Sequence, residues 1–346
     1  MYKMGHRILW VDYVKAINIF FVVLGHTVLS ASYTKFIYAF HIPLFFFLSG
    51  YFFDYSKYPN FFLFFKKRFH QLLIPYFIIN FLTYLAWLLI GRHTGEDALF
   101  QINLLEPFYG IFYGGHKGYF LHHNAPMWFL PCLFSTEMIF YLLFKSNSKI
   151  LHYIFIVILL SLGVYGNYYQ NISLPWGLSV VPTTAILYGL GSWFNHNAIQ
   201  KFNYKKYLIL IPLSFLGLLI FASFNIKVKV SAAEYGNYFY FWMAALWGIL
   251  FFISIGNLVE YLSLRFKINL KFLQFIGQNT LLIFSFHLVA GGLLKGFTYY
   301  LLKLPLEIYQ LQWVNHIYSL SSILLLVPVI LIVNKYTPWL AGKRTA

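Results

Sequence analysis

Three histidines lie within apolar stretches of the sequence, and imidazole is the side chain best suited to accept and return protons near neutral pH. His26 lies in the second half of the first such stretch, His41 stands early in the second, and His287 lies in the ninth. The alternative for each is a hydrogen-bonded packing residue. Spacing alone favours the two roles equally for His26, whereas packing is slightly favoured for His41.

The first apolar stretch carries further polar residues at helical spacing. Asp12 and Lys15 are three residues apart and can pair on one helix face. Lys15 and His26 are eleven residues apart, so they point the same way and are separated by about 16 Å along the axis. Asn18 adds a polar group close to that face. The pattern predicts a polar face that leads from the membrane boundary to His26; the alternative is that Lys15 only extends its ammonium group to the interface.

Two more ionisable residues are candidates for chemistry. Arg68 belongs to the basic segment Phe-Lys-Lys-Arg-Phe-His-Gln, where membrane anchoring is favoured and a phosphate site is the alternative. Glu137 stands midway along an apolar stretch, where a carboxylate must be protonated, paired or catalytic. Partnership with a basic residue is at least as well supported as direct chemistry for Glu137. Thr280 and His287 are seven residues apart and share a helix face.

The sequence lacks the usual motifs for metal binding, phosphate binding and a serine nucleophile. No spacing of His, Cys and carboxylate residues resembles a metal-binding motif, so no metal is expected. There is no glycine-rich phosphate loop and no nucleophile-elbow serine. Cys132 is the single cysteine, which excludes an intramolecular disulfide.

The composition identifies the class of protein that must position these residues. Of 346 residues, 60% are hydrophobic and 10% are charged, whereas a soluble domain carries about 25% charged residues. This excludes a soluble enzyme, a disordered chain and a disulfide-built secreted module. The net charge of +16 would suit nucleic acid binding, but the basic residues lie in loops between apolar runs. We therefore predict an all-α polytopic membrane protein that binds no nucleic acid.

Ten apolar stretches approach the roughly 20 residues that a helix needs to cross a bilayer. They are Val14–Leu29, Phe36–Phe53, Leu72–Ile90, Trp128–Phe144, Ile150–Gly166, Pro175–Phe194, Tyr207–Phe224, Tyr238–Gly256, Phe272–Leu294 and His316–Asn334. The first has no small-residue cleavage site and is expected to be retained as a helix. With no repeat and no linker, residues 1–346 are expected to form a single membrane domain.

Basic residues predict the orientation of these spans. If the N-terminus is cytoplasmic, 17 of the 25 Lys and Arg residues fall in cytoplasmic segments and 7 on the opposite side, as the positive-inside rule requires. Both ends of the chain are therefore expected in the cytoplasm. The long loop Gly91–Met127 would then face outward, and loops of this length are often functional.

Four separated motifs make the chain resemble the acyltransferase-3 family of membrane O-acyltransferases. They are Asp12-x-x-Lys15 through Gly25-His26, Phe40-His41-Ile42-Pro43 through Ser49-Gly50, Lys67-Arg68 through Leu73-Ile74-Pro75-Tyr76, and Ile276-Gly277-Gln278-Asn279-Thr280 ending in His287. Together they span most of the chain, and their order is more specific than any one motif.

The sequence departs from the family pattern at two places. Lys15 stands where much of the family has arginine, which keeps the charge but loses the planar fork. Trp128-Phe129-Leu130 precedes Glu137 at a longer spacing than the family's usual Trp-Ser-Leu segment. Both departures resemble the subgroup of sugar acetylases related to fucose 4-O-acetylases. No hydrolase-like domain of the kind found in some relatives is present in the sequence.

The resemblance implies transfer of an acyl group, expected to be acetyl, from acyl-CoA to a hydroxyl of a cell-surface or lipid-linked carbohydrate. No bound cofactor is expected, and the protein would lie in the plasma or inner membrane. His26 would be the general base or, alternatively, a covalent acyl carrier. The other roles implied are catalysis for Glu137, donor binding for Lys15 and Arg68, and acceptor binding or orientation for Asp12, Asn18, His41 and His287.

Two rival functions fit the composition. A transporter or flippase of a lipid-linked sugar would also have about ten spans with buried polar residues. Against it, the sequence shows no repeated half and no matched pair of Gly/Pro-broken helices. A structural scaffold leaves the intramembrane histidines and Glu137 unexplained.

Overall fold

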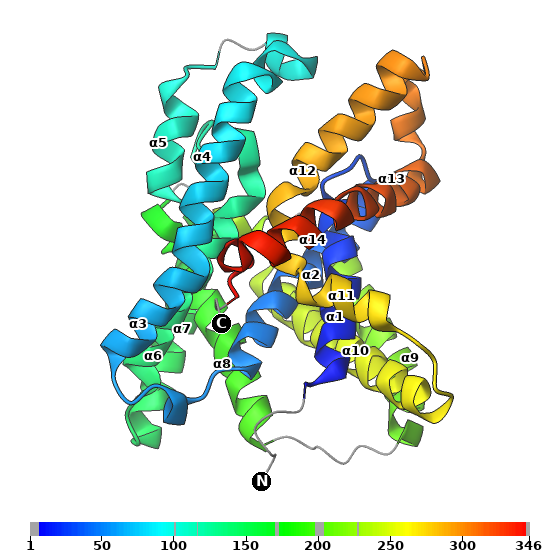
Figure 1. Ribbon diagram of the computed structural model, residues 1–346. Helices are drawn as coiled ribbons and strands as arrows, with labels where there is room; N and C mark the ends of the chain where they lie inside the picture. Colours follow the sequence, from blue (N-terminus) through cyan, green and yellow to red (C-terminus); the bar gives the residue numbers. More distant parts are fainter. Residues whose placement is uncertain are drawn as a thin grey trace.

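The structure is a computed structural model that describes residues 7–99, 102–115, 117–169, 173–197, 204–226 and 228–343 (Figure 1). In this part of the chain all longer elements are helical, and the only β-pairing is an isolated bridge between Lys229 and Glu234. The α-helices are α1 (Leu9–Gly25), α2 (Ala31–Tyr51), α3 (Phe61–Arg68), α4 (Ile74–Leu89), α5 (Leu105–Tyr113), α6 (Phe129–Phe144), α7 (Lys149–Tyr168), α8 (Val181–Asn197), α9 (Tyr204–Phe224), α10 (Tyr238–Arg265), α11 (Lys271–Gln278), α12 (Thr280–Gly296), α13 (Gln312–Leu325) and α14 (Val327–Tyr336).

Four shorter elements matter for the site. A π-helical segment, η2 (Phe69–Leu73), joins α3 to α4, and the 3-10 segment η5 (His122–Trp128) leads into α6. The other two are η7 (Val230–Ala232) and η10 (Pro338–Ala341), both of 3-10 type.

Seven helical segments among the described residues are long and apolar enough to cross a membrane: Phe61–His93, His122–Phe144, Lys149–Tyr168, Tyr204–Phe224, Tyr238–Arg265, Thr280–Leu301 and Gln312–Tyr336. Each of the ten expected stretches overlaps a helix. However, α1 and α8 have only 17 residues each, and α2 is not among the seven. The all-helical membrane class is confirmed, whereas ten crossings and the cytoplasmic ends stay predictions. Lys3, Lys201, Lys227 and Arg344, which contribute to the charge bias, lie outside the described residues.

Helix α1 is the central element, because it packs against α2, α10, α11, α12 and α13. Its apolar side chains are almost completely buried: Val14 and Ile19 are 0% exposed. Gly277 of α11 lies so close that a Cβ there would stand 2.0 Å from the carbonyl oxygen of Asp12. Only glycine permits this approach, which holds the first turn of α1 against α11.

Helices α2 and α8 are packed through small residues. The sequence predicted that Ser49-Gly50 would let another helix come close, and this is confirmed: a Cβ at Gly50 would lie 1.8 Å from the carbonyl oxygen of Tyr188 in α8. Gly191 of α8 lies equally close to the Phe47 carbonyl of α2. The two glycines fix the position of α2, which carries His41.

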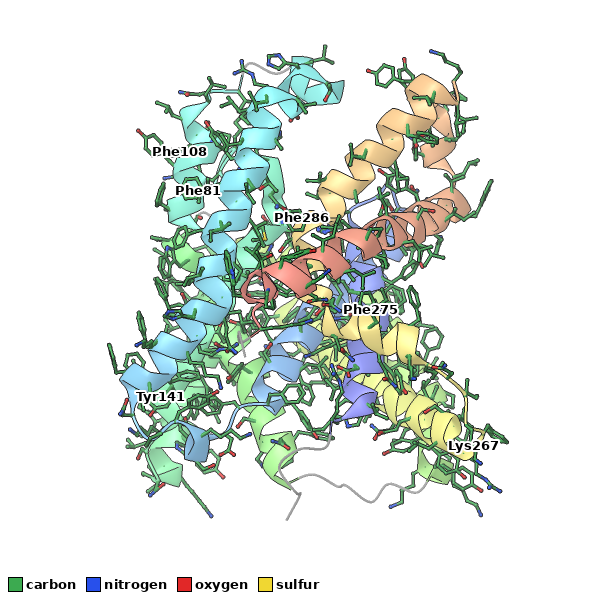
Figure 2. All side chains as sticks on the ribbon, viewed as in Figure 1. Phe81, Phe108, Tyr141, Lys267, Phe275 and Phe286 are labelled. Carbon is green, nitrogen blue, oxygen red and sulfur yellow. The ribbon has the colours of Figure 1, made fainter. Side chains whose placement is uncertain are left out.

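The ninth expected span is divided into two helices. Asn279 separates α11 from α12, and its side-chain amide donates to the Phe275 carbonyl at 2.7 Å. The last described segment of the chain folds back onto this break, beside α4 and η2 (Figure 1). Figure 2 shows Phe81 of α4 beside Phe108 of α5, and their ring centroids are 6.1 Å apart.

Candidate active site

His26 lies at the end of α1 and faces a cavity. The helix stops at Gly25, and the Tyr38 hydroxyl donates to the free Gly25 carbonyl at 3.0 Å, which satisfies one of the acceptors left over at a helix end. His26 is exposed to a cavity of about 290 Å³, which we call the upper cavity. Neither ring nitrogen of His26 makes a hydrogen bond within the described residues. The imidazole is therefore available to a ligand.

Two further histidines lie close to His26 and share one tautomer: His41 lines the upper cavity, and His287 contacts the His26 ring. The Nδ1 atom of His41 lies 2.7 Å from the Ile37 carbonyl oxygen, and that of His287 lies 2.8 Å from the Phe284 carbonyl oxygen. A carbonyl can only accept, so Nδ1 carries the proton and Nε2 is left as an acceptor in both rings. His26 and His287 are in ring contact, with centroids 5.1 Å apart.

Asn18 is not part of the cavity lining, but it supports His41, which is. It is fully buried, and its side-chain amide donates to the His41 carbonyl at 2.8 Å. This bond joins α1 to α2 at the level of His41, so Asn18 orients the neighbouring helix.

The upper cavity offers both polar and aromatic surface. Its lining comes from α1, α2, η5, η7 and α12 and consists of Val22, His26, Tyr38, His41, Ile42, Gly115, Phe120, Leu121, Ala125, Pro126, Trp128, Lys229, Val230, Ser231 and Phe284. The set combines polar side chains, among them His26, His41 and Ser231, with the aromatic rings of Tyr38 and Trp128. The lining residues from Gly115 to Pro126 come from the long loop that the sequence singled out.

A second cavity, of about 190 Å³, brings together the two residues expected to bind the donor. Lys15 and Arg68 both line this lower cavity, together with Ser49 and Thr280. The Lys15 ammonium lies 4.9 Å from the centre of the Phe52 ring, a cation–π contact. Apolar side chains complete the lining: Ile19, Phe45, Leu72, Phe129, Leu130, Leu133, Leu281 and Phe284.

The two cavities follow the same helices and meet at one side chain. Lys15 of α1 lines the lower cavity, and His26, which caps the end of α1, lines the upper one. Phe284 of α12 is the residue that lines both. Its ring packs against that of Phe129, with centroids 5.5 Å apart, and only 6% of it is exposed. Phe284, held by Phe129, is therefore the side chain at which the two spaces meet.

Arg68 is held by a buried carboxylate. Glu137, 1% exposed, accepts from the Nε and Nη2 atoms of Arg68 through both of its oxygens. The Nη1 atom donates to Gln71 at 2.8 Å. Of the alternatives that the sequence left open for Glu137, the structure shows the partnership with a basic residue. Its predicted catalytic role stays untested.

Asp12 has a different partner from the one expected. The Arg7 guanidinium donates to Asp12 at 2.5 Å, whereas the ion pairs of the described residues do not include one between Asp12 and Lys15. The reason is that α1 begins at Leu9, so Asp12 stands in its first turn, within reach of the preceding residues. Asp12 is therefore paired with Arg7, and Lys15 lines the lower cavity.

Sequence reasoning missed Tyr38, Trp128, Lys229 and Phe284 as parts of the site. Phe284 is three residues from His287, so the same helical periodicity that joined Thr280 to His287 would have found it. No group of three or more His, Cys, Asp or Glu residues that could hold a metal ion occurs among the described residues.

A family model described as an acyltransferase domain, Acyl_transf_3, matches residues 8–335. The chain belongs to the acyltransferase-3 family. The match includes every site residue discussed above and supports a membrane acyltransferase. Neither the curated proteins nor the solved structures that were searched include a match. In this acyltransferase, the two cavities joined at Phe284 are the candidate active site.

Proposed function

We propose that the protein transfers an acetyl group from acetyl-CoA to a hydroxyl of a cell-surface or lipid-linked carbohydrate at the plasma or inner membrane. The observation that carries this proposal is the pair of cavities along α1, because His26 faces one and Lys15 lines the other. Such an arrangement suits a reaction whose two substrates approach from opposite sides. The fucose 4-O-acetylase-like subgroup is part of the same proposal.

His26 is the proposed general base. Its free imidazole nitrogen takes the proton of the acceptor hydroxyl as the hydroxyl oxygen attacks the thioester carbonyl carbon. When the tetrahedral intermediate collapses, the C–S bond breaks and the imidazolium returns the proton to the CoA sulfur. The products are the acetyl ester and free CoA, and His26 returns to its starting state, so the step needs no other reactant. Covalent acyl transfer through His26 is the alternative route.

The upper cavity is proposed to hold the acceptor. Its volume of about 290 Å³ is near the lower end of the ~300–1,000 Å³ common for ligand pockets, which suits a single sugar ring. Tyr38 and Trp128 offer aromatic faces, while His41 and Ser231 offer hydrogen-bonding groups. His287 keeps the His26 ring in place through their contact.

The lower cavity is proposed to hold the acyl-bearing arm of the donor. Lys15 supplies positive charge there, the Arg68–Glu137 ion pair stands beside it, and most of the remaining lining is apolar. Glu137 acts through Arg68, since both of its oxygens are bonded to that guanidinium. The pair of Phe129 and Phe284 stands where the acyl group would meet the acceptor.

Glycan analysis tests the acceptor class. Cells with and without the gene are compared by mass spectrometry, and the proposal predicts that one acetyl increment is lost from a surface or lipid-linked glycan. An unchanged glycan profile would contradict it.

A transporter or flippase of a lipid-linked sugar is the rival function. Consumption of the thioester separates the two: purified acyltransferase releases free CoA when the acceptor is present, whereas an exporter does not. CoA release is measured with a thiol reagent, and its absence with every glycan acceptor would favour the exporter.

A further inference from the structure

A basic cleft is lined in part by Gln71, the residue to which Arg68 donates. Its volume is about 640 Å³, and its lining is Leu63, Lys66, Lys67, His70, Gln71, Ile74, Ile78, Trp339 and Lys343. Three lysines and a histidine are among these residues, and no carboxylate is. A cleft of this composition suits a ligand that carries several negative charges, because each lysine ammonium is a compact positive charge with three donors.

Two segments far apart in sequence build the cleft. One wall is α3 with η2, and the other is η10 with the residues that follow it. Gly342 has a φ of +67°, and a Cβ there would stand 2.9 Å from the Gln71 carbonyl oxygen, so glycine is needed for the chain to fold back onto η2. The contact at Gly342 therefore fixes the position of the wall that carries Trp339 and Lys343.

Lys343 is fixed at the rim of the cleft by two amides. Its Nζ atom donates to the side-chain oxygen of Asn279 at 2.8 Å and to that of Asn334 at 2.7 Å. Asn279 is the residue that separates α11 from α12. Burial, together with the charge of Arg7, lowers the pKa of Lys343.

The cleft adjoins the lower cavity. Arg68 lines the lower cavity and Gln71 lines the cleft, and the two side chains are hydrogen-bonded at 2.8 Å. Leu281, which also lines the lower cavity, is within 3.4 Å of the position that a Cβ of Gly342 would take. The cleft and the cavity that Lys15 lines are therefore neighbours on either side of the Arg68–Gln71 hydrogen bond.

The hydrogen bonds of Arg68 make a separate anion site necessary. Nε and Nη2 donate to Glu137 and Nη1 to Gln71, so the planar fork that would otherwise chelate a phosphate is engaged. The lower cavity, at about 190 Å³, is also small for a nucleotide. The cleft has more than three times that volume, and its lining holds three lysines and no carboxylate.

We propose that the cleft binds the adenosine 3′-phosphate 5′-diphosphate end of acyl-CoA, with Lys66, Lys67 and Lys343 near the phosphates and Trp339 stacked on the adenine. The pantetheine arm then passes beside Arg68 and Gln71 into the lower cavity. This inference rests on the proposed function. An anionic lipid headgroup also carries phosphate and could bind the same lysines. The experiment must therefore distinguish a bound nucleotide from a bound lipid.

Binding to the purified protein in nanodiscs of zwitterionic lipid tests the inference by calorimetry, with CoA and 3′-dephospho-CoA as probes. The wild type should bind CoA more tightly than 3′-dephospho-CoA. Lys66→Ala, at an exposed position, should weaken CoA binding about tenfold or more, as expected for loss of a charge-assisted hydrogen bond. Trp339→Ala should weaken both probes by a similar factor, because base stacking does not depend on the 3′-phosphate.

Lys343→Ala needs a folding control because Lys343 also joins Asn279 to Asn334. Its thermal unfolding is measured beside that of Lys66→Ala, and the inference is judged on Lys66 if the Lys343 variant is unstable. Lys271→Ala is the matched control: Lys271 is an exposed lysine on α11 outside the cleft, and CoA binding should be unchanged.

The outcomes separate this inference from the proposed function. If the wild type binds no CoA, the acyl-CoA donor itself is refuted. If the wild type binds CoA and the Lys66 and Trp339 variants bind it equally well, the cleft is not the nucleotide site while the donor survives. If those variants keep CoA binding but lose bound anionic lipid in mixed-lipid nanodiscs, the cleft is a headgroup site and the inference is overturned.

Discussion

The imidazole rings of His26 and His287 lie in contact, with centroids 5.1 Å apart and planes inclined by 47°. One ring stands at the end of α1 and the other on α12, so their contact depends on the packing of these helices. His287 donates from Nδ1 to its own helix and has a buried Nε2 without a partner in the described structure. An unpartnered buried nitrogen is costly, and its place beside the candidate base points to a role in orienting that base.

Replacing His287 should slow the reaction without weakening substrate binding. In His287→Gln, we expect kcat to fall at least tenfold while the KM for acetyl-CoA changes little, because the ring touches His26 rather than the donor cavity. A purely structural role would instead lower the amount of folded protein and leave the kcat of the folded fraction unchanged. Steady-state kinetics together with thermal unfolding distinguish these results.

Phe284 should limit the length of the acyl chain. Phe284→Ala removes the side chain that lines both cavities, so kcat/KM for butyryl-CoA relative to acetyl-CoA should rise about tenfold, with Phe284→Leu intermediate. Phe286→Ala, on the same helix but outside both cavities, is the control and should keep the wild-type ratio. An unchanged ratio in Phe284→Ala would show that the aromatic pair does not set acyl selectivity.

The bond between Arg68 and Glu137 should be important for stability. Glu137→Ala leaves a largely buried guanidinium without its carboxylate, and loss of one partner of a buried pair costs about 3–5 kcal/mol. Arg68→Ala should cost a similar amount, and the double variant should cost less than the sum of both. Unfolding in detergent by heat gives the comparison; additive losses would mean that the pair is not coupled.

The contact between α2 and α8 predicts contrasting effects of two glycine substitutions. Gly50→Ala would place a Cβ 1.8 Å from the Tyr188 carbonyl oxygen, and overpacking of this kind costs roughly 1–3 kcal/mol. Gly292→Ala is the matched control, because nothing lies within 4 Å of its Cβ position and alanine favours a helix by about 1 kcal/mol. Equal stability of the two variants would contradict the packing described here.

Helical periodicity predicted much of the site, because it acts within one element. The spacing drew attention to Lys15 on α1 and to His26 at its C-terminal end, and each lines one of two cavities that share Phe284. The same rule failed for Asp12, whose partner Arg7 precedes the helix. The spacing rule considers residues on a regular helix only, so a cation in the preceding segment escapes it.

Contacts between distant segments could not be predicted in the same way. Nothing in the spacing of Gln71 and Lys343 indicates that they line one cleft, since that depends on the left-handed turn at Gly342 and on the amides that hold Lys343. Likewise, composition cannot tell that Glu137 meets Arg68 rather than another cation. Long-range packing decides both.

The central claim is that His26 removes the acceptor proton, and transfer of radiolabel from acetyl-CoA to the acceptor by His26→Gln protein tests it most directly. The account predicts a loss of about 10²–10⁴-fold in kcat, the contribution typical of a general base, with CoA binding unchanged. If the variant transfers label as fast as the wild type, His26 is not the base and the proposed mechanism is wrong.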